Sequence, residues 1–541
     1  MAGTGVSLKR DAGIIGLLYF SLGGIIGSGW LFGAMYAAQQ AGPWSVISWL
    51  IGGAVVLLLA LVYAEIATML PRSGALIHIS HIGHGELVGR IWSWILFLSS
   101  VVTPPIEVMA ILTYASVNWP ASWPFLLNPH THMLTDVGFI AATIVLALVV
   151  AINFFAIKLV LWINNAATWW KLLVPAATIA ILMIFSFHPG NLTLKLGSVD
   201  PAGMLTAVST AGIIFSFLGF RLAINLGGET RNPGKYIPIA VIGSVLVSTI
   251  IYVGLQFAFL LALRPSDVAH GWAALNFVGM AGPLAAIAII VGAFWWAWVL
   301  YFDAIVSPLG TALIYSTNTS RLGMAMAEMG SAPKPLERLN RSGVPWIALV
   351  ATFVIGAVFF FPFPSWQKLV GYVSSITVLS YGIGPVVLLI LRRSLPGAER
   401  PFRLKAARWI APAAFIASNW IIFWAGFPTN NFMFILLAVL FGLYILWFFL
   451  VQRRSVSELG WRHAWWVFPY FAGMWLLSRF GPTSMEGHGL IPLGWDMLLI
   501  AIFSLVIMYA AVRSALPASG SRAYLERVQA VVLPEEIEEG P

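Results

Sequence analysis

The sequence contains no cysteine and few charged residues. Without cysteine there is neither a disulfide nor a thiolate metal site. Charged residues make up only 9% of the 541 positions and hydrophobic residues 60%, which excludes a soluble globular protein. A phosphate-binding GxxxxGKS or GxxxxGKT motif is also missing, so ATP-driven work is not expected. What remains is a polytopic, all-α membrane protein.

The charges that are present are unevenly distributed. The net charge of +9 would suit nucleic acid in a soluble protein, but in a membrane protein the location of the charges matters more than their sum. We therefore expect no nucleic acid partner. Lys9, Arg10 and Asp11 lead into a long apolar segment, not into a short one with a cleavage site, so no cleavable signal peptide is expected.

Fourteen apolar windows, each long enough to help cross a bilayer, are separated by Gly, Pro or charged turns. An even number of membrane spans places both termini on the same side of the membrane. With the N-terminus in the cytoplasm, all basic residues fall inside except Lys195, Arg264, Lys368, Arg479, Lys171 and Arg221. This skew predicts a multi-pass protein of the cell (inner) membrane with both termini cytoplasmic. The windows are roughly 12–38, 43–70, 89–117, 135–156, 160–187, 205–227, 236–263, 280–316, 345–361, 366–391, 408–427, 432–451, 464–480 and 494–513.

The first window contains GGIIGSG at residues 23–29. Four glycines in seven residues make a poor helix interior. A spanning helix that breaks there exposes backbone N–H and C=O groups that lipid cannot satisfy. We expect a ligand, an ion or water to satisfy them, as at a transporter site where a half-helix N-terminus meets a carboxylate. The alternative is a helix packing groove, which small residues also allow.

The sixth window repeats this anomaly. Residues 212–228 read GIIFSFLGFRLAINLGG, with Gly219 near the centre and a glycine pair at the end, and so can unwind at mid-depth. Two discontinuous helices five spans apart predict a five-plus-five inverted repeat with the site between them. The predicted parts are a cytoplasmic N-terminus (1–11), a first repeat (12–187), a second repeat (205–393), additional helices 11 to 14 (408–513) and a cytoplasmic tail (514–541).

Several motifs resemble the amino acid, polyamine and organocation (APC) transporter family, from about residue 13 to residue 393. That family has a five-plus-five inverted repeat (LeuT-like), so the resemblance implies this fold with four extra C-terminal helices. It also implies an amino acid or a close amine relative as substrate, bound at the centre of the membrane. The motifs are GGIIGSG, AGP at 41–43, YAEIATMLPRSG at 63–74, FSFLGF with ETRNPGKYIP at 229–238, and NTSR with RSGVP near the eighth and ninth spans.

The resemblance implies how a zwitterionic substrate is held. The N–H groups of Gly27, Ser28 and Gly29, with the Ser28 hydroxyl, would bind the carboxylate. The carbonyls near Ile25, Phe215 and Phe217 would accept from the ammonium. Phe215 also matches the position of the family's aromatic lid, although plain packing is an equal alternative.

Ionisable groups within membrane spans are costly and are therefore functional candidates. Lys171, in the fifth span, could alternate between charged and neutral forms because burial disfavours the charge. In the family, a lysine in this span can replace the sodium of sodium-coupled relatives, which would favour proton coupling. A snorkelling or carbonyl-capped structural lysine is the alternative.

Three carboxylates complete the candidate set. Glu107 follows a double proline in the third span and could carry a proton or contact substrate. Asp303 in the eighth span, ahead of Ser307 and Thr311, has similar potential. Glu65 lies near the inner end of the second span, where a structural or gating pair with a cytoplasmic base is favoured over a substrate contact.

Arg221 directly follows FSFLGF, where many relatives have an acid or a small residue. Its guanidinium cannot lose its charge. One hypothesis is a bidentate partner for a substrate side-chain carboxylate, which would select aspartate or glutamate. The other is an internal pair with Glu107 or Asp303.

His78, His81 and His84 recur every three residues in the inner loop after the second span. With no cysteine and no organised carboxylate set, neither a metal site nor a cofactor is expected, and a pH-sensitive surface role is little favoured. No nucleophile constellation indicates an enzyme. The sequence thus predicts a secondary active amino acid transporter, working by alternating access with proton symport and with acidic amino acids as a hypothesis. An exchanger and a non-transporting amino acid sensor remain alternatives, and the oligomeric state is left open.

Overall fold

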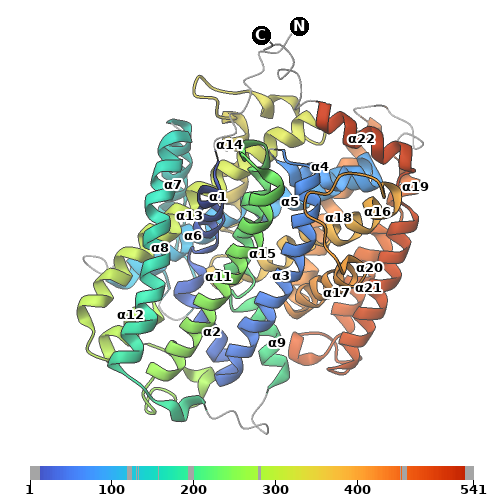
Figure 1. The fold of residues 1–541 in the computed structure, drawn as a ribbon. Coiled ribbons are helices and arrows are strands. Elements are labelled where there is room, and N and C mark those ends of the chain that lie inside the picture. Colours follow the sequence, from blue (N-terminus) through green and yellow to red (C-terminus); the bar gives the residue numbers. More distant parts are fainter. Residues whose placement is uncertain are drawn as a thin grey trace.

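The computed structural model describes residues 12–72, 74–118, 125–128, 131, 133–155, 157–192, 200–277, 282–450, 453 and 460–530. The predicted N-terminal segment 1–11 and the end of the tail, 531–541, lie outside these residues. Within the described part the chain is helical, with isolated bridges at three places and no longer strand. The helices pack side by side into one bundle (Figure 1).

Nine helical segments among the described residues are long and apolar enough to cross a membrane, or ten if one bent pair is counted as a span. The protein is therefore a polytopic membrane protein, whereas the count of fourteen stays a prediction. Each of the fourteen windows contains helix. The helices in these windows are α1 (Ile14–Ile25), α2 (Gly29–Ala41), α3 (Ser45–Met69), α5 (Glu86–Val101), α6 (Thr103–Asn118), α7 (Asp136–Phe155), α8 (Ile157–Phe185), α9 (Pro201–Thr210), α10 (Arg221–Asn225), α11 (Pro233–Ala262), α12 (Pro283–Ile290), α13 (Phe294–Glu328), α14 (Trp346–Val358), α15 (Trp366–Tyr381), α16 (Ile383–Ser394), α17 (Ala407–Trp424), α18 (Phe427–Leu450), α19 (Trp461–Ala464), α20 (Val467–Phe480) and α21 (Trp495–Arg513).

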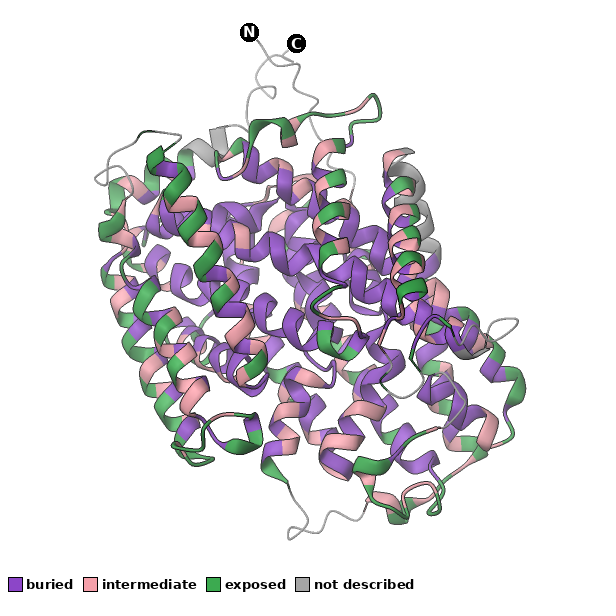
Figure 2. Cartoon of the chain, turned by 180° about the vertical axis from the view of Figure 1, so that it is seen from behind, coloured by how far each residue is buried: buried purple, intermediate pink, exposed green. Residues whose placement is uncertain are grey.

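Burial separates central helices from peripheral ones. In the spans Glu86–Ser116 and Trp366–Ser394, 94% of the apolar window is buried inside the protein, against 22% in α18. Exposed residues gather on the outer helices and buried ones in the middle (Figure 2). A helix that is apolar on every side but exposed on one needs a non-aqueous neighbour, which agrees with a membrane protein.

The first window is broken, as the sequence predicts. Helix α1 ends at Ile25, the backbone leaves helical geometry at Ile26 (φ −86°, ψ 86°), and α2 begins at Gly29. The glycines are required by close neighbours. A Cβ on Gly24 would lie 2.1 Å from a Leu222 methyl carbon, and one on Gly29 would lie 2.2 Å from Ser216 Oγ.

The sixth window is also broken, as the sequence predicts. The chain leaves α9 at Thr210 and turns at Gly212, whose φ of +90° favours glycine. It continues as a 3₁₀ helix, η4 (Phe215–Phe220), into α10, and the two parts differ in direction by 43°. Gly219 serves a different purpose, because a Cβ there would lie 2.4 Å from the backbone of Gly24.

Candidate functional site

The two broken spans meet backbone to backbone at the centre of the bundle. The Gly24 and Gly219 backbones touch, and the Ser21 hydroxyl donates to the Phe220 carbonyl over 3.4 Å. Tyrosines from other helices hold the two breaks, since Tyr252 donates to the Ile25 carbonyl and Tyr381 to the Leu218 carbonyl, each at 3.1 Å. The Ile25 carbonyl, a predicted ammonium acceptor, thus already accepts two hydrogen bonds, from the Tyr252 hydroxyl and from the Gly27 N–H, each at 3.1 Å.

A carboxylate of the chain itself caps the open end of α2. The Ser28 N–H donates to Glu107 Oε2 at 2.8 Å, and Glu107, on α6, is fully buried. Its other oxygen, Oε1, has no hydrogen-bond partner among the described residues. Gly27 makes room for it, since a Cβ there would lie 2.5 Å from Oε1. The Glu107 carboxyl group therefore occupies the positive end of the α2 dipole, at the place predicted for a substrate carboxylate.

A lysine occupies the opposite end of the break. Lys171 Nζ, from α8, donates to the Gly23 carbonyl at 2.7 Å and to the Thr311 hydroxyl on α13 at 2.9 Å. The carbonyl end of α1 is the negative end of its dipole, which favours a cation. Lys171 is fully buried, which excludes snorkelling to the surface in this conformation. It bridges the first and eighth spans, as the family resemblance implies.

Asp303 adds a third buried charge on α13. Its Oδ1 accepts from Trp170 Nε1 and from the Ser307 hydroxyl, each at 2.7 Å. Lys171 interacts electrostatically with both Glu107 and Asp303. No ion pair within 4.0 Å joins it to either carboxylate in the part of the chain that the structure describes. The structure thus brings the three predicted ionisable groups around one break without neutralising them in pairs.

An indole covers the break from another side, and the sequence reasoning missed it. Trp366, the first residue of α15, donates from Nε1 to the Ser28 hydroxyl at 2.8 Å. Its ring centroid lies 4.9 Å from that of Phe32 and 6.2 Å from that of Phe215, which meets it edge-on. The only sequence signal was a tryptophan after an N-capping serine, Ser365, a pattern without functional meaning by itself.

The two predicted phenylalanines lie in different surroundings. Phe215 packs against Trp366 beside the break, where a lid role stays a prediction. The Phe217 side chain is buried against Trp49 and Tyr252, with centroids 6.1 Å and 5.3 Å away. Its side chain belongs to the core, so any substrate contact would come from its carbonyl.

Arg221 is fully buried, and of its two hypotheses the internal pair with Glu107 or Asp303 does not form in this conformation. Its Nη1 donates to the Ser99 hydroxyl at 2.8 Å, and its guanidinium carbon lies 5.4 Å and 5.7 Å from the ring centres of Tyr315 and Tyr381. Among the described residues, no carboxylate lies within ion-pair distance. Hydroxyl and aromatic groups hold the cation without cancelling its charge.

Glu65 has the predicted basic partners. Its carboxylate is buried and accepts two hydrogen bonds from Arg392, at 3.0 Å and 2.6 Å. Arg400 lies 3.3 Å away, and the Leu404 N–H donates at 2.8 Å. The pairing is confirmed, while a gating role stays a prediction.

The three histidines are buried in a helix, which corrects their predicted place in an inner loop and agrees with the low weight given to a surface role. They lie in α4 (Ala75–His84), a short helix between spans, and are covered in part by α22 (Ala518–Ala530). His84 Nε2 is hydrogen bonded to the Ala511 carbonyl at 2.9 Å. Burial lowers the pKa of His78 to about 3 and the pKa values of His81 and His84 to about 4. In the described ranges, no group of three His, Asp or Glu residues could hold a metal ion.

Two interrupted spans that expose peptide groups to buried charges define a membrane transport protein. The amino acid permease family model matches residues 16–393, and the chain belongs to this family. It is 38% identical to the glutamate/serine transporter AimA of Bacillus subtilis over 516 residues, covering 94% of each chain. It is 34% identical to the aspartate-proton symporter of the same organism over 514 residues, covering 94% of this chain and 98% of that protein. These relatives are transporters, not enzymes.

Proposed function

We propose that this permease imports acidic amino acids together with protons by alternating access. The observation that carries the proposal is the Glu107 carboxylate on the Ser28 N–H. A substrate carboxylate needs the same donor. Two carboxylates repel at one site unless one is neutral, so substrate binding requires Glu107 to take a proton and give up the position. Proton uptake and substrate uptake are then one event.

Lys171 supports proton coupling over sodium coupling. Its ammonium already contacts the Gly23 carbonyl and the Thr311 hydroxyl, which are oxygen ligands of the kind that a hard cation prefers. A fixed ammonium leaves no need for a sodium ion there. The name of the related aspartate-proton symporter agrees with this coupling.

Arg221 supports an acidic substrate. It is a buried cation without a carboxylate in ion-pair reach among the described residues, and it sits at the end of η4, five residues beyond Ser216, which approaches Gly29. A side-chain carboxylate that reaches it would gain a charge-assisted hydrogen bond in a water-poor setting. The relatives named for glutamate and aspartate are consistent with this preference.

The test is uptake into proteoliposomes that contain the purified full-length protein. We expect uptake of labelled glutamate or aspartate to be driven by an inward proton gradient, to be abolished by a protonophore, and to be unchanged when choline replaces sodium. A requirement for sodium would contradict the proposed proton coupling. Uptake only in counterflow, without any response to the gradient, would indicate the exchanger, and ligand binding without uptake would indicate the sensor.

The topology belongs to the same proposal: fourteen spans, a five-plus-five inverted repeat in residues 12–393, and both termini in the cytoplasm. The absence of native cysteine makes it directly testable. Single cysteines placed at Arg264 and at Arg338 should react with an impermeant maleimide from opposite sides of the membrane. Labelling of both positions from one side would overturn this arrangement.

A further inference from the structure

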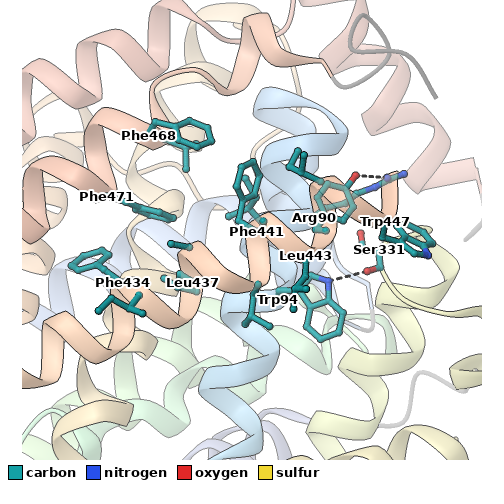
Figure 3. A pocket seen from close by; sticks show the side chains of 18 of the residues that line it. Arg90, Trp94, Ser331, Phe434, Leu437, Phe441, Leu443, Trp447, Phe468 and Phe471 are labelled. Atoms are coloured by element: carbon teal, nitrogen blue, oxygen red, sulfur yellow. Dashed lines mark hydrogen bonds between the residues drawn. The ribbon is translucent and has the colours of Figure 1, made fainter. Parts of the chain in front are cut away.

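A cavity whose lining includes none of the residues of the break lies in a groove on the outer part of the bundle. It has a volume of about 960 Å³ and is bounded by α5, α18, α20 and the turn after α13. Its walls are mostly aromatic and aliphatic, and Figure 3 shows Phe434, Phe468 and Phe471 along one end. Such a lining suits an apolar guest and not an amino acid.

The other end of the groove is polar. Arg90, Trp447 and Ser331 gather there (Figure 3). The Arg90 side chain is 8% exposed; its Nη1 donates to the Tyr444 hydroxyl at 2.7 Å and its Nη2 to Glu86 at 2.9 Å. Arg90 Nε and the Ser331 hydroxyl are buried without a hydrogen-bond partner among the described residues. An unpartnered donor on a buried arginine indicates a missing acceptor.

Arg90 is the one charged side chain in the lining of this groove as the structure describes it. Lys334 directly follows Pro333 of the lining, and Glu337 closes the same 3₁₀ turn, η7 (Lys334–Glu337). Glu86 pairs with Arg90, but its side chain is 60% exposed, so water screens this pair. The buried guanidinium, with its unpartnered Nε, therefore offers an attraction to an anion.

The length of the groove fits one leaflet of a bilayer. It follows α18 from Phe434 to Trp447, which is roughly 20 Å at 1.5 Å per residue. Half of a hydrocarbon core is about 15 Å thick. We propose that this groove binds a phospholipid with an anionic headgroup, whose acyl chain lies along α18 and whose phosphate accepts from Arg90 and Ser331.

The experiment is native mass spectrometry of the purified full-length protein with equimolar phosphatidylglycerol and phosphatidylcholine of the same acyl chains. We expect the wild type to retain phosphatidylglycerol several-fold more than phosphatidylcholine. Arg90→Gln should bring the two lipids to parity. Gly442→Phe should reduce retention of both, because Gly442 lines the groove and has open space around its Cβ position, so that the larger side chain fills the groove without disturbing the fold.

Arg513→Gln is the matched control, since it removes one exposed arginine from the end of α21, outside the groove. It should leave the lipid preference unchanged. Equal retention of both lipids by the wild type, or unchanged retention by Gly442→Phe, would overturn the proposal. So would competition by inorganic phosphate alone, which would indicate a soluble anion, or a dimer that Gly442→Phe dissociates, which would indicate a second copy of the chain in the groove.

Discussion

Glu65 and Glu107 are two fully buried glutamates with opposite surroundings. Glu65 is saturated: two arginines and one backbone N–H surround its two oxygens. Glu107 accepts one backbone hydrogen bond, and its Oε1 has no partner in the described part of the chain. A carboxylate whose oxygens are all hydrogen bonded is stabilised in its charged form. A carboxylate with an unpaired oxygen can more easily take up a proton or move to another position. We therefore expect Glu65 to stabilise the fold and Glu107 to be available for proton coupling.

The largest effect should come from Glu65→Ala. It leaves the Arg392 and Arg400 guanidinium groups and the Leu404 N–H without their shared acceptor. Breaking a buried pair on one side costs roughly 3 to 5 kcal/mol of the free energy of unfolding. Chemical unfolding in detergent measures this. Arg264→Gln is the control, since its partly exposed pair with Asp267 should contribute less than about 1 kcal/mol. If Glu65→Ala were as stable as Arg264→Gln, Glu65 would not stabilise the fold, and the proposed difference between Glu65 and Glu107 would be wrong.

Lys171→Gln should lower the rate of proton-driven uptake by about tenfold or more. The change removes a charged donor from the Gly23 carbonyl, and hydrogen bonds to charged groups contribute about 1.5 to 3 kcal/mol. Proteoliposome uptake at fixed substrate measures it. Lys171→Arg sharpens the test, because a guanidinium keeps its charge. A full response to the proton gradient in Lys171→Arg would show that this residue does not release a proton.

Glu107→Gln should separate coupling from folding. The amide oxygen can still accept from the Ser28 N–H, so the free energy of unfolding should change by less than about 1.5 kcal/mol. Uptake should lose its response to a pH gradient, while counterflow of unlabelled against labelled substrate should persist. If gradient-driven uptake survives, the proton is carried elsewhere and the two glutamates differ only in packing.

The smallest effect near neutral pH should come from the histidines of α4. Their folded-state pKa values, about 3 to 4, lie below the ordinary value near 6.5, so the unfolded chain binds protons first as the pH falls. Stability should therefore be complete above pH 6.5 and decline between pH 6.5 and 4, by about 1.4 kcal/mol per pH unit for each histidine. Unfolding at pH 7.5 and pH 5 tests this with wild type and His84→Gln. Gradient-driven uptake should not depend on His84. If His84→Gln lost this uptake, proton coupling would not reside at Glu107 alone.

Local chemistry accounts for what could be predicted. The cluster at residues 23–29 predicted the first break because four glycines disfavour helix whatever their neighbours are. The pairing of Glu65 with arginines followed from the cost of an unpaired buried charge. The glycines of residues 212–228 predicted the second break, but sequence cannot distinguish a glycine needed for a positive φ, as at Gly212, from one needed for close approach, as at Gly219.

Contacts between segments that are distant in the sequence account for the features that could not be predicted. Trp366 reaches Ser28 across 338 positions, and Arg221 reaches Ser99 across 122. Nothing near Trp366 in the sequence marks it as a cover for the break. The sequence left two hypotheses open for Arg221, because charge complementarity names possible partners but not which of them lies within reach.

By itself, the sequence determined that the chain resides in a membrane, that it breaks its first span, and that a few ionisable groups must lie inside. Apolar composition and glycine content act locally and need no partner to take effect. Only the tertiary structure decided that Glu107 faces the α2 end of the break and Lys171 the α1 end, and that Arg221 has no carboxylate in reach among the described residues. Those outcomes depend on distances between helices, which packing of the whole bundle sets.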